Sequence, residues 1–440
     1  MQPYSPERRT ALVLCGTGAH GAYHAGVLKA VQEAGVKIDV MAGQGVGAAA
    51  AALAAIDGAA RLWEADGIWR HAGVRTWYQW KWAVRVAGWL ATFLVAALAA
   101  PVVLSLLRIQ FNALLFAVLA FVLLCALVVC AGVSVWRAQR HAPVRRRAGG
   151  AWWWRIAAAP FGGEAPREAF AASMWQLIRG AATTAHPPAQ ALGRRYAEVL
   201  SESLGQPGFR ELMIVTTDLD ARHDVVGAFL REPYREGFTE ARRDRERLSE
   251  ACDLADTGRE HVFALVAGAL TPPFGCDPYL MTFPTESYWR GETHRLCDRP
   301  GAISRLLEEL AAAGVSQAII VSAVPAPPPP HRLTTPRLEL RHRLGEYLVA
   351  AESAALRDAI EMARLRFDSV YLIRPPHNPI GAFDVGGAYD EASDRHHGLG
   401  ELMDGAYEDA YQQFIEPVVG ASGEQIARVG ARRTSRPVPV

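Results

Sequence analysis

Two long uncharged segments stand out from an otherwise mixed pattern of apolar and polar residues. Residues 86–107 and 113–136 carry no charged side chain, and only a five-residue break separates them. A helix needs about 20 apolar residues to cross the hydrocarbon core of a bilayer. The break allows only a tight turn, so the pattern predicts a transmembrane helical hairpin. The alternative is a helical hairpin buried in a large soluble core.

Positive charge on the flanks predicts how this hairpin is oriented. The turn contains Arg108, whereas the flanks contain Arg70, Arg75, Lys81, Arg85, Arg137, Arg140, Arg145, Arg146, Arg147 and Arg155. Lys and Arg concentrate on the cytoplasmic side of membrane proteins. We therefore expect an integral protein of the cytoplasmic membrane, with the soluble part and both termini in the cytoplasm. Tryptophans lie where an interfacial belt is expected, at positions 77, 80, 82 and 152–154.

Outside the hairpin, short apolar runs alternate with longer helical segments. The apolar runs predict strands at 11–15, 38–42, 211–217, 279–283, 293–297, 317–322 and 369–373. Helices are predicted to end near residues 34 and 56 and to cover 167–180, 188–204, 235–251, 300–313, 337–365 and 399–415. This alternation is typical of an α/β fold with a mostly parallel sheet flanked by helices. The transmembrane hairpin is then an insertion into that fold.

The same pattern predicts five regions along the chain. They are the first part of the α/β domain (1–76), the hairpin with its flanks (77–155), the remainder of the core (156–323), a C-terminal extension (324–420) and a disordered tail (421–440).

Composition excludes several classes of function. Of the 440 residues, 46 are Lys or Arg and 45 are Asp or Glu, which gives a net charge of +1 and argues against a nucleic-acid partner. The six cysteines show no paired spacing typical of a zinc site or a disulfide framework. His396 and His397 with Asp390 and Asp394 suggest a metal, but a solvated loop before a helix explains them better. We expect no metal and no cofactor.

A glycine-rich loop follows the first predicted strand, where chemistry is expected. It reads Gly16-Thr17-Gly18-Ala19-His20-Gly21 and leads into a helix. Glycines allow a tight turn that directs backbone N–H groups at a developing oxyanion. The stretch 11–57 resembles the patatin-like phospholipase family, lipid acyl hydrolases with a Ser–Asp dyad. The family's oxyanion loop is Gly-Gly-Gly-x-Arg/Lys-Gly, so the resemblance implies an oxyanion loop of Gly16, Thr17, Gly18, His20 and Gly21.

The second predicted strand ends in Gly43-Gln44-Gly45-Val46-Gly47, where the family carries the nucleophile elbow Gly-x-Ser-x-Gly. Gly45 takes the position of the serine, and a glycine has no side-chain atom that can attack a carbonyl carbon. The alternative is a glycine loop of the phosphate-binding kind.

The resemblance continues to about residue 323 and places the dyad aspartate at Asp298. Arg299 follows it where the family has glycine, and an arginine there would favour the charged carboxylate. Two alternatives remain at this stage. Asp384, in Asp384-Val385-Gly386-Gly387, is a second candidate, and Asp298 could simply cap the helix at 300–313.

Two classes of function follow from these motifs. The first is a pseudoenzyme, a membrane-anchored patatin-like protein that binds membrane lipid or a protein partner without hydrolysing it. The alternative is a lipid acyl hydrolase that works by a non-dyad route, in which a positioned water attacks and His20 or His24 acts as the base.

Overall fold

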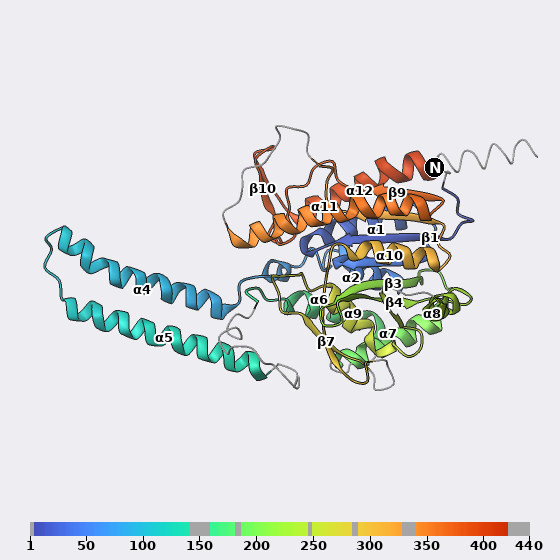
Figure 1. The fold of residues 1–440 in the computed structure, drawn as a ribbon. Helices are drawn as coiled ribbons and strands as arrows, with labels where there is room; N and C mark the ends of the chain where they lie inside the picture. Colours follow the sequence, from blue (N-terminus) through green and yellow to red (C-terminus); the bar gives the residue numbers. More distant parts are fainter. Residues whose placement is uncertain are drawn as a thin grey trace, which may run out of the picture. The chain divides into compact units, whose positions relative to one another are not determined.

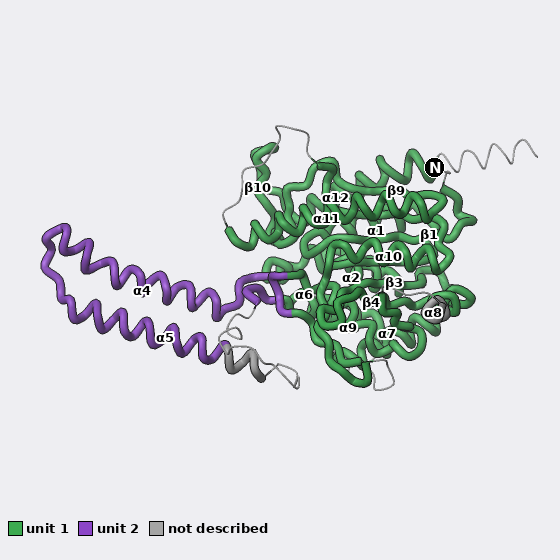
Figure 2. Tube along the Cα trace, in the orientation of Figure 1, with its two compact units in different colours: residues 1–77, 163–273, 278–440 green, residues 78–162, 274–277 purple. Residues whose placement is uncertain are grey.

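The computed structural model describes residues 4–140, 159–180, 186–244, 249–283, 289–327 and 339–420. The chain forms two compact units (Figure 2). The larger unit comprises residues 1–77, 163–273 and 278–440, and the smaller one comprises residues 78–162 and 274–277. The predicted tail (421–440) and the predicted belt residues 152–154 lie outside the described residues.

A mixed sheet of nine strands organises the described part of the larger unit (Figure 1). Seven strands follow the order β5-β4-β3-β2-β1-β8-β9. Their bounds are Thr10–Gly16 (β1), Val40–Gly45 (β2), Glu211–Asp218 (β3), His223–Phe229 (β4), Ser249–Asp253 (β5), Gln317–Ser322 (β8) and Ser369–Ile373 (β9). Strand β7 (Thr293–Cys297) joins the end of β3 and pairs with β6 (Tyr279–Thr282). A separate pair consists of β10 (Ala388–Asp390) and β11 (Arg395–His397).

The central strands are parallel, which confirms the predicted fold class. β1 pairs in parallel with β2 and β8, β2 with β3, and β8 with β9, whereas β4 returns antiparallel to β3. The register places Gly16 opposite Gly45 and Cys15 opposite Ser322. The glycine-rich loops therefore meet at the carboxyl edge of the sheet, which is where α/β proteins generally bind ligands.

Helices cover both faces of this sheet. The longer ones are α1 (Gly21–Glu33), α2 (Val46–Ala55), α6 (Glu164–Ile178), α7 (Ala189–Ser203), α8 (Tyr234–Asp244), α9 (Val262–Ala269), α10 (Ala302–Ala312), α11 (Leu340–Arg366) and α12 (Leu399–Ala410). Short helical segments are α3 (Ala60–Trp63), η1 (Gly18–His20), η2 (Ala72–Thr76), η4 (Arg259–His261) and η5 (Tyr411–Gly420).

Strand β1 shows how the sheet is buried on both sides. Ala11, Val13 and Cys15 belong to a core that also contains side chains of α10 and α11, while Leu12 and Leu14 are buried on the opposite face. Because both faces are covered, the strands read as continuous apolar runs in the sequence.

Residues after 324 complete this core. Strand β9 extends the sheet beside β8, and α12 packs along α1. The two helices approach closely at Gly26, where an added Cβ would lie 1.9 Å from the carbonyl oxygen of Met403. A side chain at position 26 would therefore force α12 away from α1.

The predicted helix at 235–251 is wrong at its end. Helix α8 ends at Asp244, and residues 249–253 form the edge strand β5 against β4. Ser249 and Ala251 are buried while Glu250 is only partly buried, which is a strand alternation. The sequence before residue 249 is rich in charged residues, as in an exposed helix, so the short strand alternation was assigned to the same helix. Strand β4 and helix α9 were not predicted either.

The smaller unit contains the apolar hairpin. Helix α4 (Trp82–Leu106) runs through Pro101 and packs against α5 (Ala113–Arg140). The apolar windows have mean hydropathies of 2.2 and 3.2, and only 6% of each is buried. The alternative of a hairpin buried in a soluble core is therefore wrong. Both helices are long and apolar enough to cross a membrane, by length and composition.

Polar groups close both ends of this hairpin. At the turn, the side-chain oxygen of Asn112 accepts hydrogen bonds from the N–H groups of Leu114 and Leu115, at 3.1 and 3.4 Å, and so caps α5. At the base, Lys81 forms an ion pair with Asp277.

Candidate functional site

The two predicted dyad positions lie side by side. Gly45 is the last residue of β2, and Asp298 directly follows β7. A Cβ added at Gly45 would lie 2.9 Å from Oδ2 of Asp298. Gly45 has φ 62° and ψ −134°, in the left-handed region that favours glycine. A turn with a glycine at its centre is thus present at the position where the sequence predicts the elbow.

Asp298 is held in a fully buried position. Its side chain accepts a hydrogen bond of 2.8 Å from the Thr17 hydroxyl and another from the Gln44 amide. Burial raises the pKa of Asp298 to about 7; the bonds from Thr17 and Gln44 oppose the rise, and the charge of Glu352 adds to it. This carboxyl group therefore exists in both protonation states near neutral pH.

The side chain of Arg299 pairs with a carboxylate other than Asp298. Its guanidinium forms an ion pair with Asp224 of β4, including a bond of 3.3 Å from Nε to Oδ1. Asp224 also accepts a 2.6 Å hydrogen bond from Thr217 of β3. The guanidinium of Arg299 thus binds a carboxylate of β4, while the backbone N–H of Arg299 hydrogen-bonds Asp298 and lowers its pKa.

The glycine-rich loop packs tightly against the elbow. Gly16 ends β1, Gly18–His20 form a short helical turn, and α1 begins at Gly21. The nearest atom to a Cβ at position 45 would be the Gly16 carbonyl oxygen, at 2.2 Å. A carbonyl oxygen accepts hydrogen bonds and cannot stabilise an oxyanion. The atom of this loop that faces the elbow most closely is therefore an acceptor.

A buried glutamate that the sequence did not reveal completes the site. Glu352 on α11 places Oε2 3.1 Å from Nδ1 of His20, and both side chains are buried. Within the described residues, neither Oε1 of Glu352 nor Nε2 of His20 has a hydrogen-bond partner. The signal was present, because Leu348, Glu352 and Leu356 share one buried row of α11 at a spacing of four residues.

A small cavity adjoins this pair. It measures about 10 Å³ and is lined by Cys15, Gly16, Gln44, Pro300, Ile303, Ser322, Glu352 and Leu356. That volume corresponds to about one water molecule. The unpartnered oxygen of Glu352 supplies a polar contact for such a water, whereas an acyl chain does not fit.

His24, the other candidate base, is differently placed. Its Nε2 lies 3.0 Å from the Cys15 carbonyl oxygen, so Nε2 carries the proton and donates it. Burial lowers the pKa of His24 to about 4, which keeps the ring neutral at pH 7. The remaining nitrogen, Nδ1, is buried without a hydrogen-bond partner in the described part of the chain.

The alternative aspartate and the possible metal cluster lie in other surroundings. Asp384 contacts Nδ1 of His342 at 2.8 Å and accepts a 2.9 Å bond from the Gly381 N–H. Asp390 lies 3.2 Å from His377 and 3.6 Å from His397. Among the described residues, no group of three or more His, Cys, Asp or Glu side chains is arranged to hold a metal ion.

The family-model comparison agrees with the motifs. The family model of patatin-like phospholipases matches residues 12–324. Among solved structures, VipD from Legionella pneumophila is similar, with 11% identity and a TM-score of 0.29 over 93% of this chain and 67% of that chain. A search of curated proteins found no match.

Proposed function

The chain belongs to the patatin-like phospholipase family, and from that premise we propose that it is a membrane-anchored pseudoenzyme. It retains the family's loop and elbow, binds membrane lipid outside the water-sized cavity beside Glu352, and hydrolyses none. Gly45 stands at the nucleophile position and Asp298 at the position of the dyad aspartate. A protein partner in place of lipid is the other outcome that the same site allows.

One observation carries this proposal. The Asp298 carboxyl group faces position 45 at contact distance, yet position 45 has no side chain. A serine hydroxyl is the atom that would form the acyl-enzyme, and its loss removes covalent catalysis. The carbonyl oxygen of Gly16 lies 2.2 Å from the point where that side chain would begin, which further supports a site that has lost its chemistry.

Two assays on the full chain in nanodiscs test the proposal. We expect no lysophospholipid hydrolysis and no labelling by a fluorophosphonate probe at the elbow. We also expect phospholipid to remain bound in native mass spectrometry after detergent exchange. Turnover together with probe labelling at any serine would overturn the pseudoenzyme proposal. Loss of all lipid would instead favour a protein partner.

We further propose that the hairpin anchors the protein in the cytoplasmic membrane with both termini inside. The exposed apolar surface of α4 and α5 and the charge of the flanks support this orientation. A reporter fused after Val440 should be cytoplasmic, and a tag at Gln110 should be accessible from outside. Recovery of the protein in the soluble fraction after lysis without detergent would contradict the anchor.

A second candidate, a lipid acyl hydrolase, is favoured by the pair of carboxyl groups at the site. In this route the oxygen of a water molecule attacks the ester carbonyl carbon while Glu352 takes a proton from that water. Protonated Asp298 then gives its proton to the leaving alkoxide, and the products are a fatty acid and an alcohol. Glu352→Gln should abolish hydrolysis by this route. The small volume of the cavity weighs against it.

A further inference from the structure

A second, larger cavity lies at the other end of the central strands. It has a volume of about 340 Å³ and is formed by the end of α1, the start of β2, the turn after α2 and the residues before β3. Gly45 ends β2, whereas Ile38 precedes the start of that strand, so this cavity is remote from the elbow. Its volume lies within the range of about 300–1,000 Å³ found for small-molecule sites.

The floor of this cavity is apolar and the rim is polar. Leu28, Val31, Ile38, Met41 and Ala54 are buried side chains that line it. The polar lining residues are Gln32, Lys37, Asp57 and Arg210. An apolar floor with a few polar groups at the opening suits an amphiphile whose tail enters first.

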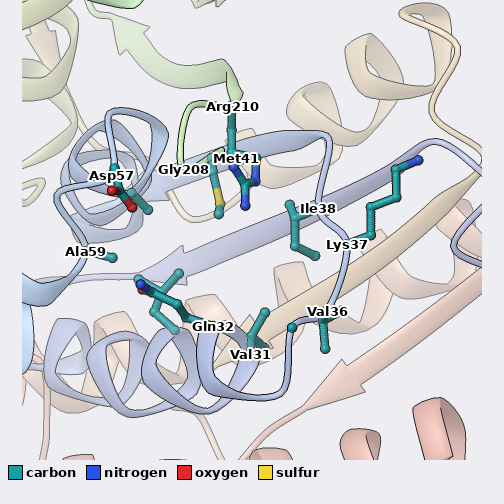
Figure 3. A pocket seen from close by; sticks show the side chains of 13 residues that line it. Val31, Gln32, Val36, Lys37, Ile38, Met41, Asp57, Ala59, Gly208 and Arg210 are labelled. Carbon is teal, nitrogen blue, oxygen red and sulfur yellow. The ribbon is translucent and has the colours of Figure 1, made fainter. Parts of the chain in front are cut away.

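Arg210 is the polar group best placed to bind such a ligand. Figure 3 shows its side chain extending into the cavity beside Met41, whereas Lys37 extends away from it. Lys37 is also 3.3 Å from Asp39. Arg210 donates a 3.3 Å hydrogen bond to the Phe209 carbonyl oxygen and, among the described residues, has no carboxylate partner. Most of its guanidinium donors remain available to an anion.

Asp57 limits the charge that this cavity accepts. It lines the cavity at the turn after α2, where its side chain packs against Gly208, two residues before Arg210 (Figure 3). Its carboxylate reduces the positive potential that Arg210 creates, so a single negative charge fits better than two. The backbone carbonyl groups at the ends of α1 and α2 accept hydrogen bonds from the N–H groups of the turns that follow. The Ala55 carbonyl accepts one from the Arg210 N–H.

From this arrangement we propose that the cavity binds a small monocarboxylate with an alkyl tail, the chemistry of a short or medium-chain fatty acid. The carboxylate binds Arg210 and the tail lies on the apolar floor. This site is independent of whether the elbow hydrolyses lipid.

Hexanoate is a suitable probe, because it partitions weakly into lipid. Binding to the full chain in nanodiscs is measured by saturation-transfer NMR and titration calorimetry. Arg210→Gln should weaken hexanoate binding by about tenfold or more, the worth of a charge-assisted hydrogen bond. Arg179→Gln, an exposed arginine at the end of α6, is the matched control and should change nothing.

Two further measurements test the contributions of the ligand's tail and of its head group separately. Ala59→Phe should fill the cavity and remove hexanoate binding, while hexyl phosphate should bind wild type more weakly than hexanoate. Equal affinity of wild type and Arg210→Gln for hexanoate would overturn the proposal, as would the absence of binding to wild type. Tighter binding of hexyl phosphate would assign the site to phosphate monoesters and reject the carboxylate.

Discussion

The carbonyl oxygen of Gly16 lies 2.2 Å from the point where a side chain at Gly45 would begin. That distance is too short for any real contact, so the glycine-rich loop and the elbow exclude a side chain at position 45 in this arrangement. Two features favour glycine at position 45: its positive φ and the closeness of the Gly16 backbone.

The first prediction concerns Gly45→Ser. Backbone strain at such a φ costs about 1–3 kcal/mol, and displacement of the Gly16 carbonyl adds to that cost. Gly35→Ser is the matched control, because Gly35 has the same φ of +62° with no atom within 4 Å of an added Cβ. Thermal unfolding should show a clearly larger loss of stability for Gly45→Ser. Equal losses would mean that the Gly16 carbonyl moves aside easily.

The second prediction concerns the pH dependence that Asp298 confers. Its pKa is about 7 in the folded protein and near 4 in the unfolded chain. Between these values the folded state holds a proton that the unfolded state has lost. The free energy of unfolding should therefore fall as pH rises from 4 to 7, by on the order of a few kcal/mol.

Asp298→Asn removes this titration and provides the measurement. Its unfolding midpoint should change less between pH 5 and pH 8 than that of the wild type. Parallel pH profiles for the two proteins would show that Asp298 ionises in the folded state as easily as in the unfolded chain.

The third prediction concerns the buried Glu352–His20 pair. Glu352→Ala should cost on the order of 3 kcal/mol, because it leaves His20 buried without its partner. Glu361→Ala on the same helix is the control, since the Glu361–Arg364 pair is exposed and should contribute under about 1 kcal/mol. Denaturant unfolding of both variants measures the difference. A similarly small loss of unfolding free energy in both variants would mean that the buried Glu352–His20 pair contributes little to stability.

The fourth prediction concerns Arg299. Because its guanidinium binds Asp224, Arg299→Gly should destabilise the fold by about 1–3 kcal/mol and leave the pH profile of Asp298 unchanged. Gly45→Ser combined with Arg299→Gly should be no more active in lysophospholipid hydrolysis than Gly45→Ser alone. A gain of activity in the double variant would show that Arg299 hinders catalysis by the introduced serine.

Local pattern and motif resemblance predicted the fold class, the apolar hairpin and the neighbouring positions Gly45 and Asp298. These features depend on periodicity and short motifs, which are local in the chain. The Glu352–His20 pair joins residues more than 300 positions apart. The spacing along α11 indicates that position 352 is buried, but only tertiary packing shows that its partner is His20. The same is true of Arg299, whose partner Asp224 lies on β4, a strand that the sequence did not predict.

Ester release by the purified full chain tests the central claim most directly. The chain in nanodiscs is incubated with a lysophospholipid, and free fatty acid is quantified beside the Asp298→Ala and Glu352→Gln variants and protein-free nanodiscs. We expect no release above the protein-free level for any of them. Release by the wild type that either variant abolishes would show that this site hydrolyses lipid without a serine at position 45.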